Sequence, residues 1–433
     1  MRKKRVLAAL LISAMGIGSL GSTVRAEEKQ TIEFWYHDGN ATSNPIFEEL
    51  IKRFEAENPQ YEVNYVGLPS DSYLQKYNTA IATGQVPDII SIRDMDVSAF
   101  VNQDALMCLE DVYENLEEKD HLNPAAVAAT RTCASDEKLY ALPQYITSDI
   151  AWVNTEKLKE AGIEAPQTID EFMKYCEEYA DSEKGTYFYS LRGGAGSMEN
   201  LFDFIFTYAD QDKLFDEEGN CVLSEPIFAE AMDLYASIYW NGWTSKDSVT
   251  NDFKAMVAEF GSKTSMYISH NSSSLAEHKK NLGEGNFMNV IAPANSNGNV
   301  VTKDLSWTGY GIMNNAKNKE GAAALMEYLI SSEGASYVCE QEGRVPINDL
   351  IYEEDWYKND PYMKVYEEML EADNVKFITH ATWLPEWNEF RSKYQEPGLQ
   401  AVLMKEKTSK EVLTEWAEYL TTAQKAYLEQ AEK

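Results

Sequence analysis

The feature that most constrains the fold is a regular alternation of strand-like and helical segments near the start of the chain. Extended, largely apolar patterns occupy residues 31–36, 61–66 and 87–92, and helical patterns occupy about 44–58 and 71–84. Strand–helix–strand units are right-handed and build a parallel sheet with helices on its faces. We therefore predict an α/β fold that begins with three parallel strands.

Polar and aromatic side chains stand at the ends of these strands. The first strand ends in Trp35, Tyr36, His37 and Asp38, and Asp94 follows the third strand. In open α/β sheets a ligand lies beyond the carboxyl ends of the strands. We expect the end of the first strand and Asp94 to lie on the same rim of the sheet.

Strand and helix patterns continue along the rest of the chain. Residues 139–154 resemble two extended pieces joined around 143–147, and later strands are predicted at 187–191, 264–268, 287–292 and 307–313. After Pro346 the pattern is nearly all helical. A chain of 433 residues is too long for one compact core, so we predict two domains.

The formal net charge of −33 limits the kinds of molecule that the protein is expected to bind. A surface this acidic repels nucleic-acid phosphates and anionic lipid head groups, which argues against binding to nucleic acid or to a membrane surface. A neutral or cationic ligand is favoured.

Residues 1–26 have the pattern of an export signal. A basic start at 2–5 precedes an apolar run at 6–20, and Val24-Arg25-Ala26 resembles a cleavage site. The run is too short to be a good membrane span, and no later stretch is apolar enough to cross a bilayer. Cleavage after Ala26 removes five basic residues and no acidic ones, which brings the charge to −38. No cysteine lies near the end of the run, so we expect an exported protein without a lipid anchor, in the periplasm or at the cell surface.

The sequence contains no complete catalytic, cofactor or metal motif. The pattern Gly16-x-Gly18-x-x-Gly21 lies inside the export signal, not between a strand and a helix. There is no nucleophile elbow or phosphate-binding loop, and the five histidines include no His-x-x-x-His pair. The five widely spaced cysteines form neither a disulfide framework nor a zinc motif, and we expect most of them to be buried. We predict no catalytic residues, no metal and no cofactor.

Carboxylates keep one enzymatic alternative open. Asp38 and Asp94 are a possible acid–base pair of a glycosidase. The other interpretation is that they accept hydrogen bonds from ligand hydroxyls or cap helices. We favour this second interpretation because no reaction motif accompanies the pair.

Aromatic residues beside predicted turns and strand ends are the more informative signal. A sugar ring has apolar faces that stack on Trp or Tyr, and hydroxyls that bind polar side chains. The candidates are Trp35, Tyr145, Trp240, Trp243, Trp307, Tyr310 and Trp383. For each of them the alternative is a buried core aromatic.

Three polar residues are candidate partners for ligand hydroxyls. Arg192 precedes Gly193-Gly194 and Arg344 precedes Val345-Pro346, so both are possible hydrogen-bond donors, or members of salt bridges. His270 ends a predicted strand and either binds ligand or belongs to a helix cap.

Five short segments stand in an informative order behind the export signal. They are FEAENPQYEV at 54–63, ATGQVPDI at 82–89, YALP and WVN within 140–154, AGI with Pro166 and Thr168 within 161–168, and NKEGA and GRVP within 318–346. Together they resemble the sugar-binding branch of the extracellular solute-binding proteins of ABC transporters.

The resemblance implies a type II periplasmic-binding-protein-like fold, with two α/β lobes joined by a hinge around a ligand cleft and no catalysis. We assign residues 27–143 and 307–350 to the N-terminal lobe. Residues 144–306 and 351–433 form the C-terminal lobe, including its helical end. Crossing strands near 142–145 and 292–307 are expected to form part of the hinge.

The resemblance also implies a set of ligand-binding residues. They are Trp35, His37, Asp38, Asp94, Tyr145, Thr147, Arg192, Trp240, Trp243, His270, Trp307, Tyr310 and Arg344, to which the aromatic pattern adds Trp383. We expect a monomer that captures a carbohydrate, such as an oligosaccharide, and delivers it to the permease subunits of an ABC transporter. The alternatives are the secreted glycosidase, a glycan adhesin or sensory co-receptor without a transport role, and a binding protein for another solute such as a polyamine.

Overall fold

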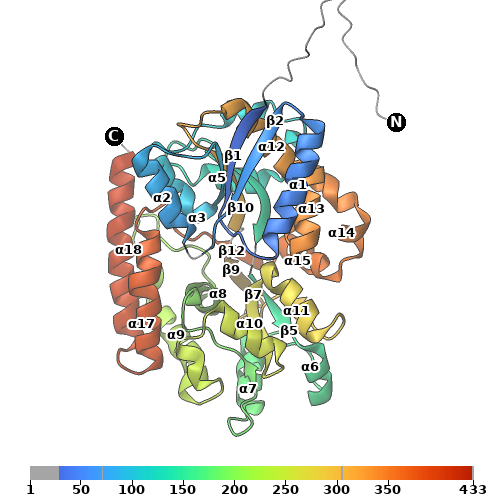
Figure 1. Ribbon diagram of the computed structural model, residues 1–433. Coiled ribbons are helices and arrows are strands. Elements are labelled where there is room, and N and C mark those ends of the chain that lie inside the picture. Colours follow the sequence, from blue (N-terminus) through green and yellow to red (C-terminus); the bar gives the residue numbers. More distant parts are fainter. Residues whose placement is uncertain (1–28, 71, 148, 304–305, 432–433) are drawn as a thin grey trace, which may run out of the picture.

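A computed structural model describes residues 29–431 with the exception of residues 71, 148 and 304–305. The predicted export signal and its cleavage site lie outside the described residues. Figure 1 shows two α/β halves, with strands β1, β2 and β10 in the upper half and β5 and β7 in the lower half. Each half contains its own sheet.

The first sheet has six strands in the order β11-β4-β10-β3-β1-β2. Their bounds are β1 Gln30–Tyr36, β2 Tyr61–Gly67, β3 Ile89–Arg93, β4 Leu142–Thr147, β10 Ser306–Ile312 and β11 Val345–Pro346. The pairs β1–β2 and β1–β3 are parallel, as the alternation in residues 31–92 predicts. Strand β10 is antiparallel to both β3 and β4.

Helices cover the first sheet. They are α1 Ser43–Glu57, α2 Tyr73–Thr83, α3 Asp94–Val101, α4 Glu110–Glu114, α5 Pro124–Arg131, α12 Lys319–Ile330 and α13 Ser332–Glu342. Helix α1 buries one face, formed by Ile46, Phe47, Leu50, Ile51 and Phe54. This spacing of three and four residues is the sequence pattern that predicts the helix.

Strands β4 and β10 pair with an irregularity at Gly309. The register shifts between Thr308 and Gly309, so that Thr308 faces Tyr145 and Gly309 faces Pro143. Pro143 has no N–H to donate, and a proline inside a sheet is tolerated at such an irregularity. A Cβ at Gly309 would lie 1.9 Å from the carbonyl oxygen of Leu142, so the two strands approach too closely for any other residue.

The second sheet has four strands in the order β6-β7-β5-β8. Its strands are β5 Asp149–Val153, β6 Tyr187–Tyr189, β7 Ser265–Asn271 and β8 Met288–Val290. Its helices are α6 Thr155–Ala161, α7 Ile169–Glu178, α8 Ser197–Ala209, α9 Pro226–Trp240, α10 Phe253–Gly261 and α11 Leu275–Leu282. The two extended pieces predicted in residues 139–154 are thus β4 and β5, which belong to different sheets.

A two-stranded parallel ribbon, β9 Val300–Lys303 and β12 Val375–Ile378, forms a third sheet. Strand β12 corrects the prediction that the chain after Pro346 is nearly all helical. The strand has only four residues and pairs with a segment about seventy positions earlier, so the local pattern does not reveal it.

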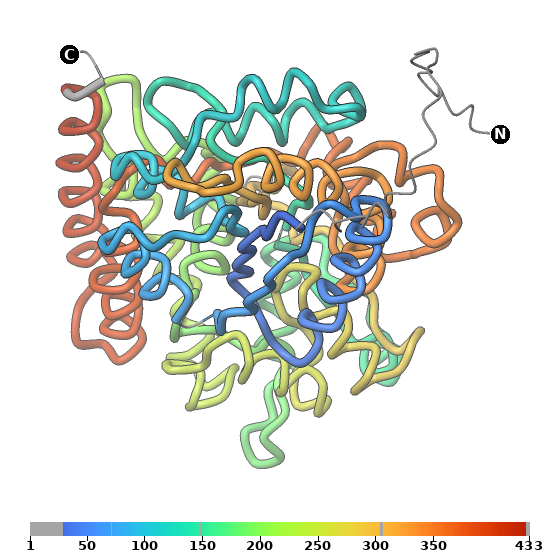
Figure 2. The backbone as a smooth tube through the Cα atoms, turned by 45° about the horizontal axis from the view of Figure 1, so that its top comes forward, coloured from blue at the N-terminus to red at the C-terminus, as the bar shows by residue number. Residues whose placement is uncertain are grey.

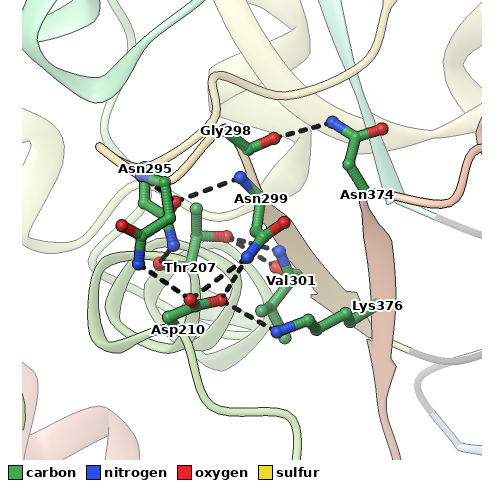
Figure 3. A network of polar contacts seen from close by, with 9 residues as sticks. Thr207, Asp210, Asn295, Gly298, Asn299, Val301, Asn374 and Lys376 are labelled. Atoms are coloured by element: carbon green, nitrogen blue, oxygen red, sulfur yellow. Dashed lines mark hydrogen bonds and ion pairs between the residues drawn. The ribbon is translucent and has the colours of Figure 1, made fainter.

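Asp210 connects this ribbon to the end of α8. Its carboxylate accepts hydrogen bonds from Asn297 Nδ2 at 3.0 Å and Asn299 Nδ2 at 2.9 Å, and it pairs with Lys376 Nζ at 3.0 Å (Figure 3). Asp210 itself has a φ of 54°, a left-handed conformation that Asp adopts more readily than most residues. The network therefore fixes β9 and β12 against α8.

The remaining segments are α14 Asp355–Asn359, α15 Pro361–Glu371, α16 Trp387–Glu389, a π-helical turn Phe390–Gln395, α17 Glu396–Leu403 and α18 Ser409–Ala431. In Figure 1, α14 and α15 lie on the right of the molecule, and α17 and α18 lie on the left. Figure 2 shows α17 and α18 in red as one edge of the molecule. Four of the five cysteines are buried, as predicted. Within the described ranges, no helix is both long and apolar enough for a membrane span.

Candidate ligand-binding site between the two sheets

The parallel pairing of β1 with β3 brings the two strand ends side by side, as predicted. The His37 N–H donates to Ser91 Oγ at 2.8 Å, and its Nδ1 lies 2.7 Å from the same oxygen. The ring packs edge-on against Tyr73 at 5.4 Å. Burial lowers the pKa of His37 well below its usual range, with Arg93 and Arg344 adding to the effect. The imidazole is therefore neutral and acts as a hydrogen-bonding group.

Arg93 and Asp94 follow at the end of β3. The Arg93 guanidinium lies over the Tyr73 ring at 5.0 Å, and its Nε donates to Asp96 Oδ2 at 3.3 Å. Asp94 begins α3, is only 7% exposed, and its Oδ1 accepts the Met95 N–H at 2.8 Å. The N-terminus of a helix stabilises a carboxylate at this position.

Strands β4 and β11 place a second group of side chains near this rim. The Arg344 guanidinium lies over the Tyr145 ring at 5.1 Å, and its Nε donates to Glu342 Oε2 at 3.1 Å. Both charged side chains are largely buried. Thr147 lies where the chain leaves the first sheet, and its hydroxyl donates to the Ser306 carbonyl at 3.4 Å.

A cluster of charged residues that sequence reasoning missed lies where the two sheets meet. It contains Lys303 at the end of β9, Asp149 at the start of β5, Glu199 in the first turn of α8, and Arg391 in the π-helical turn. Arg391 Nη2 donates to Glu199 Oε1 at 2.7 Å, and its Nη1 lies 3.3 Å from the sulfur of Met95 in α3. The cluster thus joins side chains of both halves.

The charged side chains of this cluster shift one another's pKa values. Burial raises the pKa of Asp149 to about 6, and Glu199 adds to the rise, while Lys303 and Arg192 oppose it. Burial would also raise the pKa of Glu199, but Arg391, Lys303 and Arg192 together hold it at about 2. Lys303 interacts electrostatically with Asp94 of the first half and with Glu199 and Asp149 of the second half. Lys303 is thus influenced by charged side chains of both halves.

Two predicted residues of the second half lie beside this cluster. Arg192 affects the pKa of Asp149 and of His270, and its Nε donates to the Ala195 carbonyl at 2.8 Å. His270, in β7, stacks on Phe253 at 5.7 Å and is only 6% exposed. Burial first, and then Arg192, lowers the pKa of His270 to about 3, so this imidazole is also neutral.

Two predicted residues of the first strand lie apart from the cluster. Trp35 lies within β1, and its indole stacks on Tyr77 of α2 at 6.3 Å, with the Lys76 ammonium 5.3 Å from its ring. Asp38 is half-buried, and its backbone carbonyl accepts the Ser43 hydroxyl, which orders the turn into α1.

The other predicted tryptophans and Tyr310 are in packing positions. Trp240 Nε1 donates to the carbonyls of Val402 and Leu403 at the end of α17. Trp383 Nε1 donates to Gln424 in α18 at 2.9 Å, and Trp243 packs on the core of the second half. In β10, Trp307 and Tyr310 are both 1% exposed. An aromatic next to a turn therefore does not by itself indicate a ligand face.

A small cavity of about 50 Å³ lies in the second half, lined by aromatic side chains such as Phe172 and Tyr267 together with apolar and polar ones. Its polar groups already bind one another, because Asn200 Nδ2 donates to the Ser269 carbonyl at 3.0 Å and the Tyr189 and Tyr235 hydroxyls are 3.3 Å apart. Few free polar groups remain there for a hydroxylated ligand.

The described part of the chain contains no group of three or more His, Cys, Asp or Glu side chains arranged to hold a metal ion. Two α/β halves, each with its own sheet and with charged side chains of both halves close together, match the arrangement expected of a two-lobe solute-binding protein. Residues 38–336 match the family described as bacterial extracellular solute-binding proteins. The chain belongs to this family.

Relatives of known sequence match most of the chain. A binding protein of Brucella abortus is 26% identical over 389 residues, which cover 88% of this chain and 89% of that protein. A protein of Streptococcus mutans named multiple sugar-binding protein is 23% identical over 327 residues, which cover 73% of this chain and 75% of its own.

A solved structure confirms the fold. An ABC transporter solute-binding protein of Thermotoga lettingae, bound with α-D-tagatose, superposes with a TM-score of 0.79 at 19% identity, covering 92% of this chain and all of that chain. The predicted type II periplasmic-binding-protein-like α/β fold is therefore correct.

Proposed function

We propose that the protein captures a carbohydrate outside the cytoplasm and delivers it to the permease subunits of an ABC importer. The name of the Streptococcus mutans relative and the tagatose bound to the Thermotoga lettingae protein support a sugar as the ligand. Family membership supports a role in binding, not in catalysis.

The observation that carries this proposal is the mixture of donors and acceptors between the two sheets. Lys303 and Arg192 are potential hydrogen-bond donors, Asp94 and Asp149 are potential acceptors, and the neutral imidazole of His37 has one nitrogen of each kind. A sugar hydroxyl both donates and accepts, so it can pair with each of these groups. Buried polar groups of this kind need such partners.

The proposed mechanism is closure of two lobes around the ligand. We propose that the lobe boundaries lie at the ends of β4 and β10, not at the predicted 143/144 and 306/307, because the whole of each strand belongs to the first sheet. One lobe then contains residues 27–147 and 306–350, and the other contains 149–303 and 351–433. We place the hinge where β4 is followed by β5 and where β9 is followed by β10, which differs from the predicted 142–145 and 292–307. The ligand binds to one lobe, the lobes close, and the permease recognises the closed form.

The proposed site combines the charged cluster with four of the residues predicted from the sequence, His37, Asp94, Arg192 and His270. Two interactions support this choice: Asp94 interacts electrostatically with Lys303, and Arg192 with Asp149 and His270. We propose that the protein is exported and acts as a monomer.

A thermal-shift screen tests the function. A ligand that binds only the folded protein stabilises it by about 2.7 kcal/mol at a concentration of one hundred times Kd. We expect a rise in Tm with at least one sugar among maltose, maltotriose, sucrose, raffinose, xylobiose and galactose.

The same samples, analysed by chromatography after incubation, are expected to contain the sugar unchanged. Hydrolysis of the sugar that is lost in an Asp94→Asn variant would instead establish a glycosidase. A rise in Tm with spermidine and with none of the sugars would contradict the carbohydrate proposal.

A further inference from the structure

The two lysines of the β9–β12 ribbon have opposite surroundings. Lys376 on β12 pairs with Asp210 at 3.0 Å, and its side chain is 35% exposed (Figure 3). Lys303 on β9 is only 7% exposed. Among the described residues, no carboxylate oxygen lies within 4.0 Å of the Lys303 ammonium, and none of them accepts a hydrogen bond from it.

Burying most of a lysine side chain is costly unless other groups replace the hydration that its ammonium loses. Burial lowers the pKa of Lys303, but Asp94, Glu199 and Asp149 together raise it above its usual value, so the side chain keeps its charge. These three carboxylates come from α3, α8 and β5. Carboxylates of both halves therefore stabilise the positive charge of Lys303 without a direct ion pair among the described residues.

We propose that Lys303 is a ligand-binding residue that donates hydrogen bonds to hydroxyl oxygens of an uncharged sugar, while Asp94 and Asp149 accept hydrogen bonds from neighbouring hydroxyls. This inference rests on the proposed function and specifies the ligand: a neutral sugar, not a sugar phosphate or a polyol phosphate.

The balance of charge around Lys303 supports an uncharged ligand. Four carboxylates interact with one another or with Lys303, namely Asp94, Asp149, Glu199 and Asp203, and the cations in the same group are Lys303, Arg391 and Arg192. Arg93 also interacts with Asp94, but it already pairs with Asp96 at 3.3 Å. No positive charge is left over for an anion. A phosphate monoester would add a charge of about −1.5 to −2 next to these carboxylates.

Asp203 reinforces this exclusion. Its carboxylate accepts the backbone N–H of Lys303 at 2.8 Å and the Thr302 hydroxyl at 3.0 Å, so it is fixed beside strand β9. Burial raises the pKa of Asp203, and the neighbouring Asp149 raises it further. An additional anion would increase the same repulsion.

Titration calorimetry on the purified protein tests the role of Lys303. The probe is whichever sugar of the panel above gives the largest rise in Tm, and the variants are Lys303→Met and, as the matched control on the paired strand, Lys376→Met. We expect Lys303→Met to weaken binding at least about 30-fold, since hydrogen bonds to charged groups are the stronger kind. Lys376→Met is expected to stay within about twofold of the wild type.

The same experiment includes wild type with glucose 6-phosphate and with sn-glycerol 3-phosphate, neither of which we expect to bind. Tm and circular dichroism verify that each variant is folded. If Lys303→Met does not fold, Lys303→Gln, which keeps a donor but loses the charge, replaces it with an expected loss of about tenfold.

Equal affinity of the wild type and the folded Lys303 variant for the sugar would overturn the inference and leave the proposed function intact. Tighter binding of a phosphate ester than of every sugar would also overturn the inference. A wild type that takes none of the sugars would refute the proposed function and the inference together.

Discussion

The His278 side chain packs against three aromatic rings. It is fully buried and packs edge-on against Phe260 at 4.8 Å, Trp152 at 5.0 Å and Phe287 at 5.5 Å. Neither ring nitrogen has a hydrogen-bond partner among the described residues. Burial lowers the pKa of His278 to about 3. The folded protein therefore resists protonation at a residue that the unfolded chain protonates near pH 6.5.

This residue predicts a loss of stability in acid. Between pH 6.5 and 3 the unfolded chain binds more protons than the folded one, so the free energy of unfolding falls as the pH falls through this range. The share of His278 is about 2 kcal/mol between pH 7.5 and pH 5. Urea unfolding at pH 7.5 and pH 5 measures the difference in the free energy of unfolding between the two pH values. His278→Leu is expected to reduce this difference by about 2 kcal/mol. If the variant and the wild type show the same difference, His278 is not the cause of the loss of stability in acid.

At the residue scale, the sequence predicts which side chains stand at strand ends but not which ones face a ligand. His37 and Asp94 follow from the rule that parallel strands end at one edge. Trp35 and Trp240 stand beside turns as well, yet they pack against helices. The sequence does not predict Lys303 and Glu199, because they approach other charged residues only when segments that are distant in the sequence meet in the fold.

Among the elements, strand β10 depends most on a single residue. Gly309→Ala is expected to destabilise the protein by about 3 kcal/mol, because the new Cβ would lie 1.9 Å from a backbone oxygen and 2.6 Å from the Cα of Pro143, and neither can move alone. Guanidinium unfolding measures the change.

The matched control lies two residues further along the same strand. A Cβ at Gly311 would lie 3.0 Å from the end of the flexible Leu106 side chain. Gly311→Ala is therefore expected to cost less than half as much. A similar loss for both variants would show that glycine matters for β10 in general and not for its approach to β4.

At the element scale, the sequence predicts those helices and strands whose apolar residues recur at regular spacing within a short segment. The helices and strands of residues 31–92 follow from apolar spacing, and the structure confirms them. The ribbon β9–β12 escaped prediction because each strand has four residues and finds its partner across a long stretch of chain. The sequence also predicts two extended pieces in residues 139–154, but the junction predicted at 143–147 lies within β4, and the local pattern does not reveal that β4 and β5 belong to different sheets.

For the whole molecule, the net charge of −33 predicts a dependence on salt. Like charges repel one another in the compact state, and salt screens this repulsion. The exposed ion pairs, such as Lys52–Glu49 and Lys184–Asp181, lose little by screening because each contributes at most about 1 kcal/mol. Raising NaCl from 0.05 to 0.5 M is expected to raise Tm by about 2–4 °C in a calorimetric scan. A fall in Tm would mean that the ion pairs outweigh the repulsion.

The central position of β10 in the first sheet delays the folding of the amino-terminal part of the chain. This strand lies between β3 and β4, yet it begins at Ser306, after the whole of the second sheet has been synthesised. The early strands β1 to β4 cannot close into their final order until that late segment arrives. Contacts this distant along the chain slow folding. The amino-terminal portion therefore stays incompletely folded for most of synthesis, a state that suits a polypeptide that must cross a membrane before it folds.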